Sequence, residues 1–522
     1  MLKNHTPTTR WSRADTVAQV TKLEVAKAKG TSQRSFAQAH HIPRSTLQYW
    51  QTRKHGLDSS PALIAFFESP DGLAFLHRLV LALQFVMTFV GDCGLRLVQE
   101  VVQLAGLEPF VANSLHSRQQ CSVEMETAIR RHANQERARL AKDMTPRDIA
   151  ACADETFHPE ICLVAIEPVS NFILLEQYAE RRDASTWKEA LNSAIEGLPV
   201  QITQVTSDEG KGLVAHVRQG LGAHHTPDLF HIQQELSRAT AVALASQVRQ
   251  AAEKVERAAP DPDRQLAAVV QASERQERAR TAIRGLSQAC HPIDLQTGAW
   301  RDAHQVEHDC TKQMNEIQAV AIEAALPERC GKGLAKAQRV LPAMIQTIAF
   351  FHQQVARQFA TLKLAAAEIH LVKEFLLPAA YLARVADKAP TADIRHPIRQ
   401  QAEQLYTDAQ VLLATVEPEQ RQRLERVAQN GADLFQRSSS CVEGRNGQLA
   451  LRHHSLHTIS DTRLEALTAV HNYFLKHPDG TTAAERFFGS KPANLFHWLL
   501  DHLNMPARPA KKRTPERHIN IL

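Results

Sequence analysis

Apolar residues recur every three or four positions along most of the chain, a spacing that predicts amphipathic helices. One such helix covers residues 12–29 and ends at Gly30. A short helix over 32–42 follows, and a third begins after the break at Pro43. The helical spacing then continues through 60–145. The first 145 residues therefore predict helices alone.

The most apolar stretch lies at residues 73–90, and it is interrupted by His77, Arg78 and Gln84. A membrane-spanning helix needs about 20 nearly uncharged residues. This stretch therefore predicts a buried helix, and we expect no membrane partner.

From residue 149 the pattern changes to short runs that are typical of β-strands. The predicted order is three antiparallel strands, a helix, a strand, a second helix and a strand before a long helix. This order resembles the ribonuclease-H-like fold, in which the first and fourth strands lie side by side. The predicted strands cover 149–157, 161–166, 172–178, 201–207 and 225–231, with the first helix over 183–197 and the second after Gly212.

An acid ends both of the strands that are expected to be neighbours, Asp154 in the first and Asp208 after the fourth. Two carboxylates in one place repel each other unless a cation lies between them. Two divalent ions about 4 Å apart suit phosphodiester cleavage, and oxygen ligands favour Mg²⁺ or Mn²⁺. Asp208 could instead cap the next helix, and Glu155 or Glu209 could be the ligand.

The ribonuclease-H-like fold that this order resembles needs a third acid, a glutamate on a late helix. Before any such residue comes a long helical segment, residues 232–430, with breaks near Pro260–Pro262, Pro292, Pro327 and Pro390–Pro397. A serine-rich stretch then leads to Glu443, with Asn446 one turn further on the same predicted helix face. Glu485 is the rival, because Thr482 and Ser440 each form a possible capping box with the glutamate three residues later.

Together these motifs resemble DDE-type bacterial insertion-sequence transposases over most of the chain. The resemblance implies metal-dependent hydrolysis at transposon ends and strand transfer by the freed 3′-hydroxyl, with Asp154, Asp208 and Glu443 as catalytic and metal-binding residues. The long helical insertion departs from the spacing of compact integrases. The matching motifs are A-D-E-T-F at Asp154, T-S-D-E-G at Asp208, D-L-F-H at 228–231, S-S-C-V-E-G-R-N at Glu443, and the segments 464–472 and 479–488.

The distribution of charge along the chain indicates a binding partner. The net charge is only +5, but residues 1–55 carry ten Lys or Arg against Asp15 and Glu24, and the tail from Pro506 is also basic. Basic ends on a body without excess positive charge indicate a polyanionic partner, most simply DNA, although solvated ends are the alternative for the tail. Eight scattered cysteines without a C-x-x-C pair predict reduced thiols and a cytoplasmic protein. With DNA as its partner, we expect the protein to be associated with the bacterial nucleoid.

The first three helices match a DNA-reading helix-turn-helix, because the last of them starts with polar and basic residues. The excess of basic residues also favours DNA binding. A plain three-helix packing module is the alternative, with Leu47 and Trp50 in the core in either case. The predicted DNA-binding residues are Arg34, Arg44, Ser45, Thr46, Gln48, Arg53 and Lys54.

Several other residues are possible auxiliaries. Trp300 could stack on an extruded base of a hairpin intermediate, or it could pack between helices. His304, Glu307 and His308 fit an inverted zinc-protease pattern, but they lie in a charged helix without a clear third ligand. The remaining possible auxiliaries, at phosphates or beside the acids, are Lys211, His231, Arg445 and Asn446.

The sequence thus predicts a mixed, mostly helical fold. It consists of an N-terminal helix-turn-helix and an α/β ribonuclease-H-like core that is split by a large all-helical insertion. We expect double-stranded DNA as partner and at least a homodimer, because two transposon ends must be paired. A DNA-binding regulator derived from a transposase and a metal-dependent nuclease without strand transfer are the alternatives. The predicted domains are the helix-turn-helix at 1–57, a helical connector at 58–147, the core at 148–231 and 437–505, the insertion at 232–436 and a basic tail at 506–522.

Overall fold

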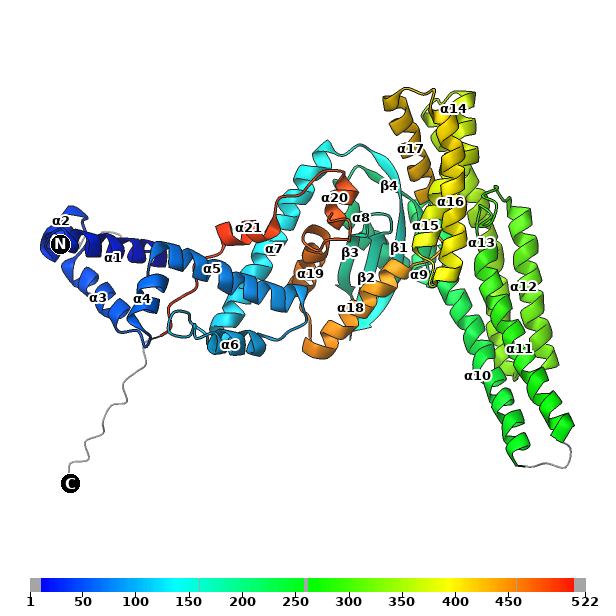
Figure 1. The fold of residues 1–522 in the computed structure, drawn as a ribbon, viewed down its shortest axis with the longest axis horizontal. Helices are drawn as coiled ribbons and strands as arrows, with labels where there is room; N and C mark the ends of the chain where they lie inside the picture. The colour runs from blue at the N-terminus through cyan, green and yellow to red at the C-terminus, as the bar shows by residue number, and fades with distance from the viewer. Residues whose placement is uncertain (1–10, 159, 258–261, 457, 511–522) are drawn as a thin grey trace. The chain divides into compact units, whose positions relative to one another are not determined.

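The computed structural model describes residues 11–158, 160–257, 262–456 and 458–510. These residues are mostly helical and contain one mixed sheet of five strands (Figure 1). The mostly helical, mixed class expected from the sequence is therefore confirmed. The described ranges leave out the following predicted basic residues of the two ends: Lys3, Arg10, Lys511, Lys512, Arg513 and Arg517.

The chain divides into two units. Unit 1 consists of residues 1–144 and 448–522, and unit 2 consists of residues 145–447. The first boundary lies close to the expected start of the core. The closing helices that we assigned to the core, however, belong to unit 1 from residue 448 onward.

Unit 1 begins with three helices, α1 (Arg13–Ala28), α2 (Gln33–Ala39) and α3 (Arg44–His55). Ser12 caps α1 in a capping box with Asp15. The helices enclose a small core of their own, which contains the buried side chains of Val20, Leu23, Phe36, Ala37, Ile42, Leu47 and Trp50.

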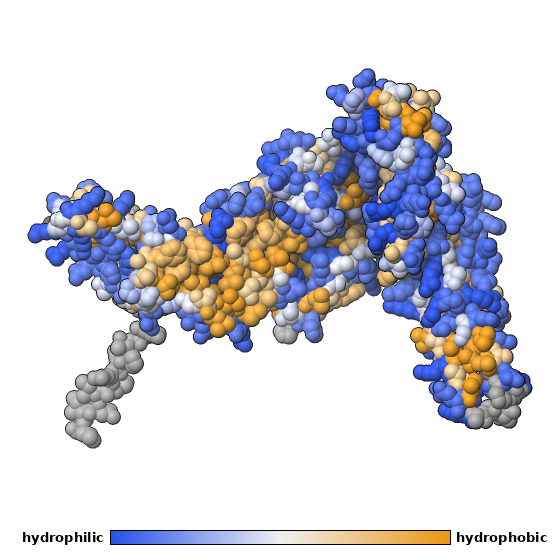
Figure 2. Space-filling model, viewed as in Figure 1, coloured by the Kyte–Doolittle hydropathy of each residue, from blue (hydrophilic) through white to orange (hydrophobic). Residues whose placement is uncertain are grey.

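The expected helical connector follows, with a single-turn π-helix, η1, after its second helix. In α5 (Pro70–Phe85) the expected buried helix is buried on one side only, because Phe75 and Leu79 are exposed. Figure 2 shows apolar surface on the middle part of the molecule. The other elements of unit 1 are α4 (Pro61–Phe67), η1 (Val86–Val90), α6 (Leu95–Leu104), α7 (Leu115–Asp143), α19 (Asp461–Tyr473), α20 (Ala483–Phe488) and α21 (Leu495–His502).

Among the described residues, Pro70–Val90 is the one helical stretch that is long and apolar enough to cross a membrane. Half of its most apolar window is buried inside the protein. Core helices of soluble proteins share these features, so the stretch is weak support for a membrane span.

The sheet of unit 2 contains the five strands that the sequence predicted. Its order is β3-β2-β1-β4-β5, with β1, β2 and β3 antiparallel and with β4 parallel to both β1 and β5. The first strand therefore lies beside the fourth, as expected. The strands are β1 (Arg147–His158), β2 (Glu160–Glu167), β3 (Phe172–Ala179), β4 (Val200–Ser207) and β5 (His224–Pro227).

The last strand is shorter than predicted. It ends at Pro227, and Asp228 caps the long helix α10 (Leu229–Glu256) by accepting a hydrogen bond from the Phe230 N–H at 2.8 Å. The prediction that residues 228–231 continue the strand was wrong, because Asp228 is a strong capping residue and starts the helix there.

The insertion is all helical, as predicted, and its helices share one large core. Pro397, which we expected in a break, lies inside α16, where the helix has already begun at Ala392. Besides α10 and α16 (Ala392–Leu413), the insertion contains α11 (Pro262–Ala289), α12 (Ala303–Glu323), α13 (Glu328–Thr361), α14 (Ala366–Leu371), η3 (Val372–Leu376), α15 (Leu377–Asp387) and α17 (Pro418–Asp433).

Candidate active site

Two neighbouring strands bring Asp154 and Asp208 to the same edge of the sheet. In the parallel pairing of β1 with β4, the last pair in register is Cys152 with Thr206. Asp154 and Asp208 each follow two residues later. They are therefore level with each other where β4 ends, as the order of the strands predicted.

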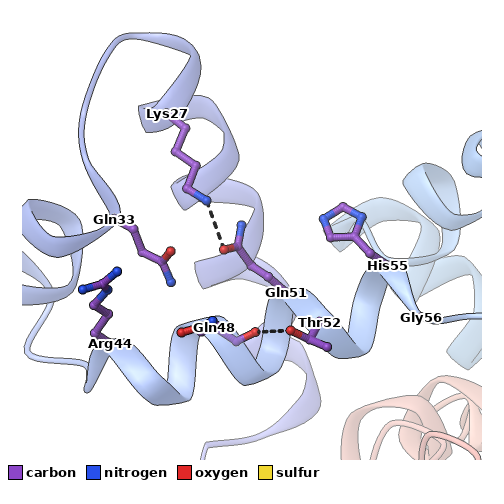
Figure 3. A pocket seen from close by; sticks show the side chains of 8 residues that line it. All are labelled: Lys27, Gln33, Arg44, Gln48, Gln51, Thr52, His55 and Gly56. Carbon is purple, nitrogen blue, oxygen red and sulfur yellow. Dashed lines mark hydrogen bonds between the residues drawn. The ribbon is translucent and has the colours of Figure 1, made fainter.

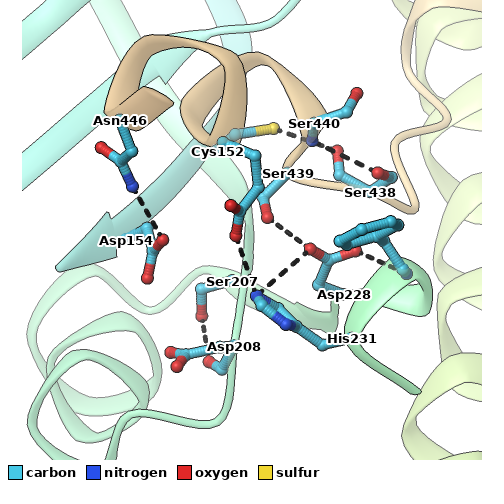
Figure 4. A network of polar contacts seen from close by, with 12 residues as sticks. Cys152, Asp154, Ser207, Asp208, Asp228, His231, Ser438, Ser439, Ser440 and Asn446 are labelled. Carbon is cyan, nitrogen blue, oxygen red and sulfur yellow. Dashed lines mark hydrogen bonds and ion pairs between the residues drawn. The ribbon is translucent and has the colours of Figure 1, made fainter. Parts of the chain in front are cut away.

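Each of these aspartates has a hydrogen bond that fixes it. Asn446 donates from Nδ2 to Asp154 Oδ2 at 3.0 Å (Figure 4), and Asp154 is 9% exposed. Asp208 Oδ1 accepts from the Gly210 N–H at 3.1 Å, which closes a turn. The next helix, α9 (Lys211–Ala215), starts after Gly210 without a side-chain cap, so the structure shows no capping role for Asp208.

The neighbouring glutamates are held by other groups. Glu155 accepts from Trp187 Nε1 at 3.0 Å and lies 3.1 Å from Arg182 Nη1. Trp187 belongs to α8 (Ala184–Ile195), so Glu155 anchors that helix to β1. Glu209 lies 3.7 Å from Arg339 of α13.

The predicted third acid, Glu443, comes from α18 (Ser440–Leu456), the helix that follows the insertion. Glu443 is in its first turn, and its Oε1 lies 3.1 Å from His231 Nε2. The helix begins at Ser440, and the carbonyl of Ser439 accepts the Glu443 N–H at 3.2 Å. The helix thus starts one residue before the position implied by a capping box with Ser440 as cap.

Glu485, the rival to Glu443, has the structural role that its sequence allowed. Its N–H donates to Thr482 Oγ1 at 3.1 Å, which caps α20. It belongs to unit 1, whereas Asp154 and Asp208 belong to unit 2 together with Glu443.

A network of polar contacts supports the position of Glu443. His231 Nε2 also lies 3.9 Å from Asp228 Oδ2, and Ser439 Oγ donates to the same carboxylate oxygen (Figure 4). Asp228 is 2% exposed. Asp228 and Ser439 were missed as site residues, because their contact joins positions that are 211 residues apart. The only signals were the D-L-F-H and serine-rich motifs around them.

The electrostatics connect the three acids. Burial is the largest cause that raises the pKa of Asp154 to about 7, and the charges of Asp208 and Glu443 raise it further. The Glu155 N–H and His231 act in the opposite direction. The charges of Asp208 and Glu443 are thus close enough to oppose the ionisation of Asp154.

Arg445, two residues after Glu443, fixes α18 to the sheet. Arg445 Nε and Nη2 lie 2.7 and 2.6 Å from the carboxylate oxygens of Glu176 in β3, and both side chains are buried. Asp154 pairs with Val164, and Val164 pairs with Glu176, so the two acids lie on the same face of the sheet. Arg445 therefore positions α18 over that face and is not free to contact phosphate.

The donor chemistry fits a hard cation, although the site is not a complete ligand cage. Among the described residues, no group of three or more His, Cys, Asp or Glu side chains is arranged to hold a metal ion. Asn446 Oδ1 is nevertheless buried without a hydrogen-bond partner in the described structure, next to Asp154. Mg²⁺ commonly uses one or two carboxylates and keeps several waters. Asp154 and Asp208, with Asn446 and Glu443 beside them, are the residues that could hold it.

The other predicted auxiliary residues lie in different surroundings. Lys211 is exposed at the start of α9. The ring of Trp300 stacks on Phe351, with 5.8 Å between the ring centroids, and its Nε1 donates to the Lys373 carbonyl at 2.6 Å. Trp300 thus packs against the core of the insertion, while the base-stacking role stays a prediction.

The predicted DNA-binding residues fall into two groups. Arg34, Arg44, Ser45 and Gln48 are exposed, and Thr46 is partly exposed. Arg53 donates to the carbonyl of Pro509, and Lys54 is buried against Glu24 at 2.8 Å. These last two side chains therefore hold unit 1 together.

Comparison with known proteins gives one family. Residues 372–515 match a family of unknown function (DUF6399). No curated protein and no solved structure matches the chain. The matched region includes the end of the insertion, Glu443, Arg445 and Asn446, but not Asp154 or Asp208.

Proposed function

We propose that this protein is a DDE-type DNA transposase that cleaves DNA at transposon ends and joins them to target DNA. The observation that carries the proposal is the convergence of Asp154, Asp208 and Glu443 from β1, the end of β4 and α18. Burial and the charges of the two other acids raise the pKa of Asp154 to about 7. Such a cluster, with a strongly shifted pKa, is typical of a functional site.

The sheet supports the same proposal. Its order, with an antiparallel β1-β2-β3 meander and with β4 parallel to β1, agrees with the order expected for a ribonuclease-H-like core. We infer that unit 2 is such a core and that α10 to α17 are inserted between its second and third acids. Fold alone does not determine function, so the proposal depends on the acids.

Each residue of the site has a role in the proposed reaction. When bound, two Mg²⁺ or Mn²⁺ ions would activate the attacking oxygen and stabilise the leaving oxygen. Asp154 and Asp208 would hold them, and Asn446 orients Asp154 through its hydrogen bond. His231 orients Glu443, Asp228 lies against His231, and Ser439 fixes Asp228 by donating a hydrogen bond to it.

The first three helices supply DNA binding in this proposal, as a helix-turn-helix whose exposed residues include Arg34, Arg44, Ser45 and Gln48. A homodimer or larger assembly would pair two transposon ends. The protein would act in the bacterial cytoplasm on the nucleoid.

The deciding experiment is cleavage and strand transfer with Mg²⁺ or Mn²⁺ on labelled duplexes taken from the DNA that flanks the gene. Asp154→Asn, Asp208→Asn and Glu443→Gln are each expected to lose at least 100-fold in activity while still binding DNA, an order of magnitude typical of removing one essential catalytic group. Glu209→Gln and Glu485→Gln are the matched controls and are expected to stay active.

The other outcomes separate the alternatives. An active Glu443→Gln together with an inactive Glu485→Gln would move the third acid to Glu485. Cleavage without joining would indicate a metal-dependent nuclease. DNA binding without cleavage by the wild type would indicate a regulator derived from a transposase.

A further inference from the structure

A polar groove of about 630 Å³ lies between the first three helices of unit 1 (Figure 3). One wall comes from Lys27 of α1 and Gln33 of α2, and the other comes from α3. The residues of α3 and its end that line it are Arg44, Gln48, Gln51, Thr52, His55 and Gly56. These positions recur every three or four residues, so they form one side of the helix. The opposite side, with Leu47 and Trp50, packs into the core.

The charge of this groove favours an anionic ligand. No Asp or Glu occurs anywhere in residues 25–57, and the residues that line the groove include Lys27, Arg44 and His55. The acids that flank this stretch are Glu24 and the exposed Asp58. The Glu24 carboxylate accepts two hydrogen bonds from Lys54 Nζ at 2.8 and 3.0 Å and lies 3.9 Å from His55. Lys54 is 7% exposed, so it offsets the charge of Glu24 from inside the protein.

The hydrogen-bonding groups of the groove match the edges of purine bases. An arginine forms two hydrogen bonds with guanine in the major groove, and a glutamine forms two with adenine. Arg44 and Gln48 are both exposed, and they lie on consecutive turns of α3. Gln51 Oε1 already accepts from Lys27 Nζ at 3.1 Å (Figure 3). Its amide N–H groups are thus left to donate to acceptors, such as purine N7.

The spacing of the two side chains sets the spacing of the bases. Four residues of α-helix rise about 6 Å. Consecutive base pairs are about 3.4 Å apart along the DNA axis. Arg44 and Gln48 would therefore contact bases about two base pairs apart.

We infer that this groove is the sequence-reading surface of the protein, and that it recognises a guanine and an adenine about two base pairs apart in the major groove of double-stranded DNA. Arg44 reads the guanine, Gln48 reads the adenine, and Lys27 and Gln51 act together across the groove. Lys54 makes no DNA contact and keeps Glu24 neutralised. This inference deepens the proposed function, because it names what the DNA-binding part of the transposase recognises.

The test is selection of bound duplexes from a randomised library by the full-length protein, followed by affinity measurements on the selected duplex. We expect a guanine and an adenine at the stated spacing. Arg44→Ala is expected to lose the preference for guanine, and Gln48→Ala the preference for adenine, each by roughly 5- to 150-fold. Each variant should keep the preference at the other position.

A charge-matched pair separates base reading from general attraction. Lys27→Ala is expected to weaken binding to all duplexes alike. It should also reduce the slope of log affinity against log salt concentration by about one, the value for one phosphate contact. Lys22→Ala removes the same charge from an exposed position of α1 outside the groove, and it is expected to leave both the affinity and the preferences almost unchanged.

The outcomes are distinguishable from those of the cleavage assay. Selection without any base preference, unchanged preferences in Arg44→Ala and Gln48→Ala, or tighter binding to single-stranded RNA would overturn the inference even if the protein cleaves DNA. Sequence-selective binding through Arg44 and Gln48 by a protein that never cleaves DNA would support the inference and remove the proposed transposase activity.

Discussion

Arg445 donates two hydrogen bonds to the carboxylate of Glu176, at 2.7 Å from Nε and 2.6 Å from Nη2, and both side chains are buried. This pair joins α18 to β3, one residue before Asn446 contacts Asp154 and two residues after Glu443. The geometry of the proposed active site therefore depends on an ion pair that has no part in its chemistry.

The first prediction concerns this ion pair. Removing one partner of a buried pair leaves the other charge uncompensated, which typically costs about 3–5 kcal/mol. Arg445→Met and Glu176→Leu are each expected to destabilise unit 2 by about that amount and to speed hydrogen exchange in α18. The double variant should recover most of the loss, because no charge is left alone.

Thermal unfolding and hydrogen-exchange mass spectrometry of the four proteins measure this cycle. If the double variant lost as much stability as the two single variants added together, the assigned pairing would be contradicted. Cleavage activity should fall as hydrogen exchange in α18 becomes faster, because that helix carries Glu443.

The second prediction concerns pH, and it follows from the pKa of Asp154, which burial and the charges of Asp208 and Glu443 raise to about 7. The pKa of an unfolded aspartate is about 3.9. Between about pH 4 and pH 7 the unfolded chain has released a proton that the folded protein still holds, so the stability of the folded protein falls as pH rises. Above pH 7 the loss is complete.

Asp154→Asn lacks this loss. With a chelator present, the variant is expected to be more stable than the wild type at pH 8, by at most about 4 kcal/mol, and nearly equal to it at pH 4. Melting temperatures at both pH values measure the difference. Added Mg²⁺ should stabilise the wild type at pH 8 more than the variant. A gap between the two proteins that is the same at both pH values would argue against the raised pKa.

The strands and the two aspartates could be predicted because their signals are local. Short apolar runs and turns indicate the strands within residues 149–207. Their order resembles the ribonuclease-H-like fold, and that resemblance implies that the first and fourth strands are neighbours, so Asp154 and Asp208 were expected at the same level. The start of α10 was misplaced because the apolar Leu229 and Phe230 resemble a strand, although Asp228 before them is a helix cap.

The contacts that complete the site could not be predicted, since they join residues far apart in the chain. Glu176 and Arg445 are 269 residues apart, and the path of the helical insertion decides where α18 returns to the sheet. Lys54 shows a similar limit at shorter range. Its charge indicated phosphate binding, but the orientation of α3 directs it to Glu24.

The third prediction compares two glycines near the acids. A Cβ on Gly212 would lie 2.1 Å from the carbonyl oxygen of Arg182, so the backbone would have to move. Gly444 lies inside α18, and an added Cβ there would meet no described atom within 4 Å. Gly444→Ala is therefore expected to stabilise the protein by about 0.5–1 kcal/mol, because it lowers the entropy of the unfolded chain.

Gly212→Ala is expected to destabilise unit 2 by about 1–3 kcal/mol and to lower cleavage by displacing the segment after Asp208. Urea unfolding and the cleavage assay measure both effects. A tolerated Gly212→Ala with normal activity would show that the contact between α9 and the Arg182 backbone is not required.

The last prediction concerns Trp300, whose ring stacks on Phe351 and whose Nε1 donates to the carbonyl of Lys373 at 2.6 Å. Trp300→Ala removes the ring from the edge of the insertion core and is expected to cost about 3 kcal/mol of stability. Trp300→Phe keeps a smaller aromatic ring and loses the hydrogen bond, and the lost hydrogen bond alone costs about 1 kcal/mol.

Cleavage measured well below the melting temperature of both variants then separates packing from base stacking. If Trp300 only packs, both folded variants cleave and transfer strands like the wild type. If it stacks on an extruded base, Trp300→Ala loses strand transfer while it is still folded, and Trp300→Phe keeps most of it, because a phenylalanine ring still offers a stacking face. Normal melting of Trp300→Ala would contradict the packing role itself.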